Sequence, residues 1–185
     1  MKSIIINYKI INDISHDRLR LLIDSCVSKR YIVVINLYDF SLGKITKGLI
    51  NNQVNINIID KDYEDIKKSD SLICGEMLKF ADSSAIMIMD DNIRFLPDAI
   101  DLLEIDAFED EHVGSMYCDY ETEGALKIRS YLRSHPSHQI PILFLILSTT
   151  KVIQNLGEET PLMKIYHSHA SKHIPNALCS VLANR

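Results

Sequence analysis

The sequence predicts an α/β protein with a mostly parallel sheet and helices on both faces. Two observations predict this class. Residues 1–90 alternate β-branched apolar runs with amphipathic segments, an order typical of a parallel sheet with right-handed crossovers. The run from Ser84 to Met89 is apolar or small with no polar alternation. A strand of that kind is covered on both faces, as the strands of a parallel sheet are.

The elements expected in the first half follow from periodicity. Strands are expected at residues 3–8, 31–37, 54–59 and 84–89. Helices are expected at about 16–29, 44–51 and 70–81, where apolar residues recur three and four positions apart. Ser15 belongs to a polar loop that can cap the first helix.

The second half is less regular. Pro97 suits the first turn of a short helix that contains Ile100, and the acidic stretch 104–111 is expected to be solvated surface. Strands are expected at 112–118, 140–148 and 174–182. Helices are expected at 125–135, which is basic and amphipathic, at about 149–157, and from Thr160 onward.

Length and composition narrow the function classes. The chain has 185 residues, 46% hydrophobic and 24% charged, as expected for one soluble globular domain. The net charge is −5 with scattered Lys and Arg, which disfavours a nucleic-acid surface. The four cysteines are widely spaced and are expected to be reduced thiols of a cytoplasmic protein. The apolar runs are too short for a signal peptide or a membrane span.

The main candidate site is the segment Asp90-Asp91-Asn92, directly after the expected fourth strand. Carboxylates at the C-terminal end of a parallel strand lie at the edge where open α/β folds bind ligands. Consecutive residues leaving a strand point to opposite sides, so one carboxylate could hold a divalent cation and the other a hydroxyl. The alternative interpretation is a solvated turn, in which Asp and Asn are common.

Several segments together resemble the GT-A glycosyltransferases of family two, which are inverting nucleotide-sugar transferases. The segment Ile86–Asn92 followed by Phe95-Leu96-Pro97-Asp98 resembles their D-x-D strand, in a form similar to a bacterial spore-coat glycosyltransferase. The other segments that carry the resemblance are Ile4–Tyr8, Val33–Ser41, Val113–Tyr120, Leu156–Leu162 and Ile174–Leu178. The resemblance implies a GT-A (Rossmann-like) domain over residues 1–185, with a nucleotide-binding half (1–92) and a shortened acceptor half (93–185).

The resemblance also implies a Mn²⁺ or Mg²⁺ cofactor. Asp91 is the first candidate ligand, and Asp90 is the candidate for the ribose or for a metal-bound water. Such a metal is typically held by one or two carboxylates together with substrate phosphates. His169 is a further candidate ligand, since on a helix it would share a face with His173. The alternative for these histidines is an exposed polar helix surface.

The remaining roles follow from the same resemblance. Glu159, with Glu158 second, is the candidate base that deprotonates the acceptor hydroxyl, as inversion requires. Asp39 is the candidate that accepts a hydrogen bond from the nucleotide base, and Tyr8 the candidate that stacks on that base. The alternatives are a favourable helix start at Glu158-Glu159, a turn-forming Asp39 and a core-edge Tyr8.

The predicted function is therefore a metal-dependent inverting glycosyltransferase of hexosyltransferase type, with a UDP-sugar as the favoured donor. The sequence departs from the family at Met89, which replaces the first Asp of D-x-D, and at Lys9, which replaces an Asn. A catalytically idle nucleotide-binding or interaction module therefore stays open, as does another doubly wound domain with a generic Mg²⁺ site. The acceptor is unknown, and the short acceptor half suggests a small acceptor, a partner chain or a homo-oligomer.

Overall fold

The computed structural model describes residues 1–11, 14–40, 53–62, 64, 83–122, 125–127, 146–154 and 168–182. The helices expected at 44–51, at 70–81 and from Thr160 lie outside these residues. The described strands are β1 (Ser3–Ile10), β2 (Ile32–Asp39), β3 (Asn55–Asp60), β4 (Ala85–Asp90), β5 (Ile93–Phe95), β6 (Val113–Thr122), β7 (Ala125–Lys127), β8 (Ile146–Ser148) and β9 (Ala170–Val181). The described helices are α1 (His16–Asp24), α3 (Thr149–Gln154) and the 3₁₀ turns η3 (Ile100–Leu102) and η4 (Ile105–Glu109).

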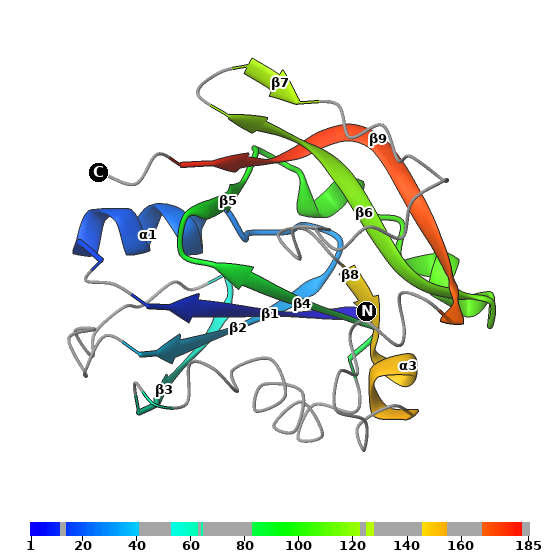
Figure 1. The fold of residues 1–185 in the computed structure, drawn as a ribbon, viewed down its shortest axis with the longest axis horizontal. Helices are drawn as coiled ribbons and strands as arrows, with labels where there is room; N and C mark the ends of the chain where they lie inside the picture. The colour runs from blue at the N-terminus through cyan, green and yellow to red at the C-terminus, as the bar shows by residue number, and fades with distance from the viewer. Residues whose placement is uncertain are drawn as a thin grey trace.

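The strands form one sheet in the order β3-β2-β1-β4-β8-β6-β9-β5, with β7 paired to β6 (Figure 1). Strands β3, β2, β1 and β4 are parallel, and β9 is parallel to β6. The antiparallel pairs all involve β5, β7 or β8. The α/β class with a mostly parallel central sheet is thus confirmed, and the first half supplies its regular part.

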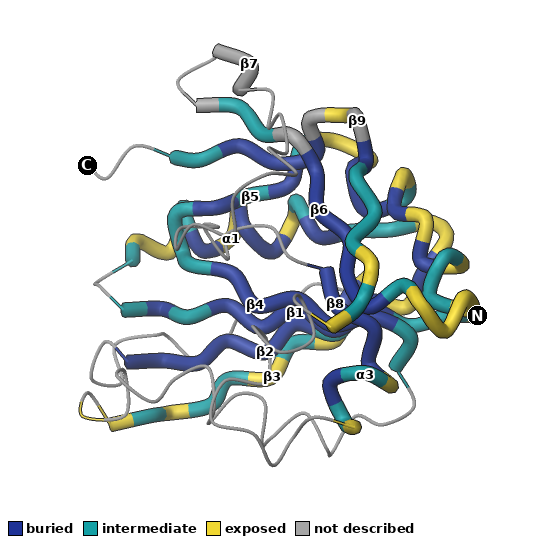
Figure 2. Tube along the Cα trace, turned by 45° about the vertical axis from the view of Figure 1, so that its right-hand side comes forward, coloured by how far each residue is buried: buried dark blue, intermediate teal, exposed yellow. Residues whose placement is uncertain are grey.

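The core lies between one face of the sheet and α1. Every second residue of β1, β2 and β4 faces this core, as strand alternation requires. The core residues of these strands are Ile4, Ile6, Tyr8, Ile10, Val33, Ile35, Leu37, Ala85, Met87 and Met89. The residues between them, such as Ile5 and Ile86, are also buried, which confirms that these strands are covered on both faces. Figure 2 shows that β1, β2 and β4 are buried along most of their length, whereas β3 consists of exposed and half-buried residues.

Helix α1 begins where the sequence predicts and ends earlier. Ser15 is its N-cap, and the Ser15 hydroxyl accepts a hydrogen bond from Arg18 N. The helix was expected to reach about residue 29, but its last residue is Asp24. Ser25 ends it, because the Ser25 Oγ donates to the Leu22 carbonyl at 2.7 Å. Hydroxyl groups that bond to the backbone in this way compete with helix continuation.

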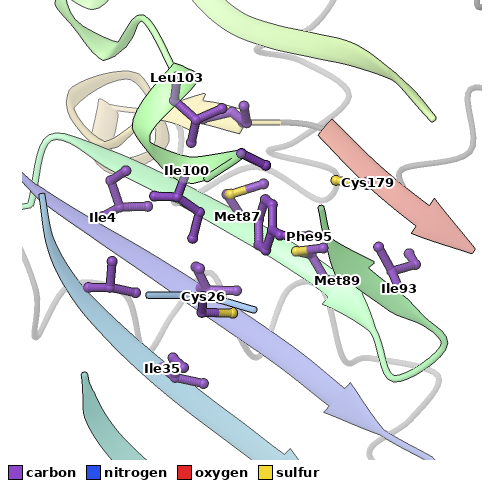
Figure 3. Packing of buried hydrophobic residues seen from close by; sticks show 14 of the residues in the cluster. Ile4, Cys26, Ile35, Met87, Met89, Ile93, Phe95, Ile100, Leu103 and Cys179 are labelled. Carbon is purple, nitrogen blue, oxygen red and sulfur yellow. The ribbon is translucent and has the colours of Figure 1, made fainter. Parts of the chain in front are cut away.

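The core continues into the second half of the chain. Met89, Phe95 and Ile100 belong to the same buried cluster as Cys26 and Cys179 (Figure 3). Cys26, Cys118 and Cys179 are free and buried, as the composition predicts for reduced thiols.

One expectation for the second half is wrong. Residues 125–127 form strand β7, paired antiparallel with the end of β6, and not the start of a helix over 125–135. The edge of β6 offers hydrogen-bonding partners that periodicity does not reveal. The acidic stretch 104–111 is exposed at most positions, as expected, although it contains η4 and the buried Ile105. In the part of the chain that the structure describes, no helix is long and apolar enough to cross a membrane.

Candidate functional site

The carboxyl ends of the four parallel strands bring several polar residues to one edge of the sheet, on the left in Figure 1. Strand β2 ends at Asp39, β3 at Asp60 and β4 at Asp90. In the ladders, Lys9 of β1 lies opposite both Tyr38 and Asp90. This edge is where open α/β sheets bind ligands, so the expected position of the acidic segment is confirmed.

Strand alternation sends the side chains at this edge to two faces. Asp39 has the parity of Val33, Ile35 and Leu37, which face the core beside α1. Lys9 and Asp90 have the opposite parity and share the other face of the sheet. Asp39 and Asp90 therefore leave the sheet on opposite sides, and only a ligand lying across the strand tips could contact both.

Lys9 and Asp90 form an ion pair on their shared face. The Lys9 Nζ lies 3.1 Å from the Asp90 Oδ1, and the two side chains are 16% and 35% exposed. The Asp90 Oδ1 is buried and accepts no aligned hydrogen bond from the described residues, so the contact is one of charge and not a directed hydrogen bond. The sequence shows Lys9 only as a departure from a family pattern, whereas the structure makes it a member of the site.

The turn after β4 supplies oxygen atoms that suit a hard cation. Asp91 and Asn92 are both partly buried, and within the described residues the buried Asn92 Oδ1 has no hydrogen-bond donor. Buried acceptors of this kind are normally paired, and carboxylate and amide oxygens are ligands that Mg²⁺ and Mn²⁺ accept. The described residues contain no group of three His, Cys, Asp or Glu side chains that could hold a metal. The donor set thus fits a cation that takes its other ligands from a bound phosphate.

Tyr8 lies in the core and not at a ligand-binding surface. Its ring is 0% exposed, and its hydroxyl lies 3.6 Å from the Cys26 Sγ. Burial raises the pKa of Tyr8 well above its usual value, and burial raises the pKa of Cys26 to about 12, so both groups stay neutral. The expected stacking of Tyr8 on a base finds no support in this geometry.

Asp39 ends β2 as expected but is 1% exposed. Its backbone carbonyl accepts a hydrogen bond from Lys61 N at 3.0 Å. A nucleobase could reach the Asp39 side chain only after the residues that cover Asp39 move aside.

The histidine pair does not have the predicted geometry. His169 lies in a bend, and His173 lies within β9, so the expected helix face is wrong. Four residues of extended chain span about 13 Å, compared with about 6 Å along one turn of a helix, so the close i, i+4 spacing on which the metal prediction depends is absent. His173 instead stacks on Tyr117 of β6, with ring centroids 4.9 Å apart. Glu158 and Glu159 lie outside the described residues, and their roles stay predictions.

A chain of side-chain amides near the edge, which runs from an exposed asparagine into the buried sheet, was not predicted from the sequence. The Asn57 Nδ2 donates to the Asn36 Oδ1 at 2.9 Å, and the Asn36 Nδ2 donates to the Asn7 Oδ1 at 3.0 Å. The Asn7 Nδ2 then donates to the Met87 carbonyl at 3.0 Å. These amides tie β3, β2, β1 and β4 together on the face that carries Lys9 and Asp90. The available signal was an Asn within each of three successive apolar runs.

The fold is of the GT-A glycosyltransferase type. No protein-family model matches the chain, and no curated protein sequence matches it. Among solved structures, the "Crystal structure of S. aureus TarS 1-349" is similar, with a TM-score of 0.63 and 15% sequence identity. The alignment covers 98% of this chain and 60% of that chain, so this chain corresponds to less than two thirds of the solved TarS 1-349 chain. TarS is a glycosyltransferase of the GT-A type. At this identity the similarity shows the fold alone, and it does not extend to family two or to the spore-coat type.

Proposed function

We propose that this chain transfers a sugar from a nucleotide-sugar donor, with a UDP-sugar favoured, and that it inverts the anomeric centre. One observation carries the proposal. On a GT-A-type fold, Asp90, Asp91 and Asn92 lie at the tip of strand β4, and within the described residues the buried Oδ1 atoms of Asp90 and Asn92 have no aligned hydrogen-bond donor. Nucleotide phosphates and a divalent cation are the ligands that suit such an edge.

The residues of the edge take different roles in this proposal. Asp91 would hold Mn²⁺ or Mg²⁺, and Asp90 would contact the ribose or a metal-bound water. The cation, when bound, acts as a Lewis acid that offsets the negative charge developing on the leaving diphosphate. Asp39 stays the candidate that hydrogen-bonds to the nucleobase of the donor, on the condition that its buried carboxylate becomes accessible. Glu159, with Glu158 second, would accept the proton of the acceptor hydroxyl.

A second candidate function is a nucleotide-binding module on the same fold that has lost turnover. The observation that favours it is the Lys9–Asp90 ion pair, because an ammonium at this position competes with a divalent cation for the Asp90 carboxylate. A residue that lies next to the candidate metal ligands can in this way reduce metal affinity.

Hydrolysis of UDP-sugars and GDP-sugars with Mn²⁺, measured together with UDP binding by calorimetry, separates the two candidates. We expect the wild type to hydrolyse a nucleotide sugar, and Asp91→Asn to weaken Mn²⁺-dependent UDP binding by more than about tenfold, the order found when a metal site is disturbed. Asp106→Asn is the matched control, since Asp106 pairs with Lys2 at the opposite end of β1. Metal-dependent UDP binding without turnover would favour the idle module.

The proposed base is tested in the same assay. Glu159→Gln should keep donor binding and lose transfer, whereas unchanged transfer would remove Glu159 from its role. If wild type binds no nucleotide with or without Mn²⁺, the proposed function is wrong.

A further inference from the structure

Lys9 is a largely buried lysine at the candidate site. It is the second-last residue of β1, the strand between β2 and β4, at their carboxyl ends. Strand alternation places its side chain on the sheet face opposite the core, and that side chain is only 16% exposed. A lysine this far buried is normally paired with an anion, and here the Asp90 carboxylate is that anion.

The charged side chains at this edge sum to a net negative charge. Asp39, Asp60, Asp90 and Asp91 bring four negative charges to the strand ends, and Lys9 and Lys61 bring two positive charges. A nucleoside diphosphate that approaches the strand tips adds further negative charge, which requires additional cations. An ammonium carries three N–H donors, so Lys9 can contact a phosphate oxygen while it stays beside Asp90.

We propose that Lys9 is a diphosphate-binding residue of this site, and that its ammonium allows a nucleoside diphosphate to bind in the absence of a divalent metal. The inference rests on the proposed function, since it assumes a nucleotide donor at this edge. The Lys9–Asp90 contact holds the ammonium at the strand tip before the ligand arrives, so little side-chain ordering is needed on binding. Added Mn²⁺ or Mg²⁺ then strengthens binding beyond the level that Lys9 supports alone.

The test is calorimetric titration of UDP into the full chain, in EDTA and in Mn²⁺. In EDTA, wild type should bind UDP, and Lys9→Met should weaken that binding by about tenfold or more, as expected for a lost charge-assisted hydrogen bond. Lys9→Arg, which keeps the charge, should retain the binding. Lys2→Met is the matched control, because Lys2 is also ion-paired but lies at the opposite end of β1. In Mn²⁺ the loss caused by Lys9→Met should be smaller.

The outcomes separate this inference from the proposed function. Equal UDP affinity of wild type and Lys9→Met in EDTA overturns the role of Lys9. Binding that requires Mn²⁺ and does not change in Lys9→Met also overturns it, while the proposed function stands. Absence of UDP binding under every condition overturns the proposed function, and the role of Lys9 with it. Thermal unfolding checks each variant, and Lys9→Gln replaces Lys9→Met if the latter does not fold.

Discussion

The amide chain of Asn57, Asn36 and Asn7, of which Asn36 and Asn7 are buried, leads to a sharp prediction about stability. Asn36 is its central member: it is fully buried, donates to Asn7 and accepts from Asn57. Asn36→Leu keeps the side-chain volume nearly constant but removes both hydrogen bonds. Asn57 lies at an exposed position and can turn its amide to water, whereas the Asn7 side chain, which is 0% exposed, cannot.

The magnitude follows from these contacts. Two lost hydrogen bonds cost about 1 kcal/mol each, and the orphaned Asn7 Oδ1 adds about 1–3 kcal/mol. Burial of the more apolar leucine offsets about 1–2 kcal/mol of this. The expected net loss is about 2 kcal/mol of unfolding free energy. In a chain of this size each kcal/mol lowers Tm by about 2–4 °C, so Tm should fall by about 4–8 °C.

Urea unfolding and thermal unfolding of purified protein measure both quantities. The double variant Asn7→Leu/Asn36→Leu removes both partners of the buried bond. It should therefore be more stable than the sum of the two single changes predicts, by about 1–2 kcal/mol. A loss below about 0.5 kcal/mol in Asn36→Leu, or strict additivity of the two changes, would refute the reasoning.

Two further predictions concern α1 and the loop that contacts η3. Ser15→Ala should lower the unfolding free energy by about 1 kcal/mol through loss of the N-cap bond to Arg18, whereas Ser15→Asp should restore it; urea unfolding of both variants checks this. Asp101 accepts hydrogen bonds from Ser28 and from the Lys29 and Arg30 amides. Partial burial raises its pKa, but these hydrogen bonds outweigh that effect and lower the pKa below 3.8. The folded state therefore favours the carboxylate. Asp101→Asn should cost about 1–2 kcal/mol at neutral pH, and the difference from wild type should shrink as the pH falls below about 3.9. A pH-independent difference, measured by urea unfolding across that range, would contradict the assignment.

The sequence by itself determined the four parallel strands of the first half. Residues 3–8, 31–37, 54–59 and 84–89 were predicted as strands, and each overlaps an observed strand, because a buried parallel strand requires a continuous apolar run. The sequence also predicted that Asp90 and Asp91 lie at the carboxyl end of this strand, and the structure has Asp90 as the last residue of β4 with Asp91 directly after it.

Only the tertiary structure decided which side chains meet at that edge. The pairing of Lys9 with Asp90 depends on the register between β1 and β4, and register is a property of two strands and not of either alone. Tyr8 is buried because strand alternation places its side chain on the face of β1 that packs against α1. The strand at 125–127 and the extended chain around His173 depend on hydrogen bonds to β6. A local pattern cannot reveal these partners, because they lie far away along the chain.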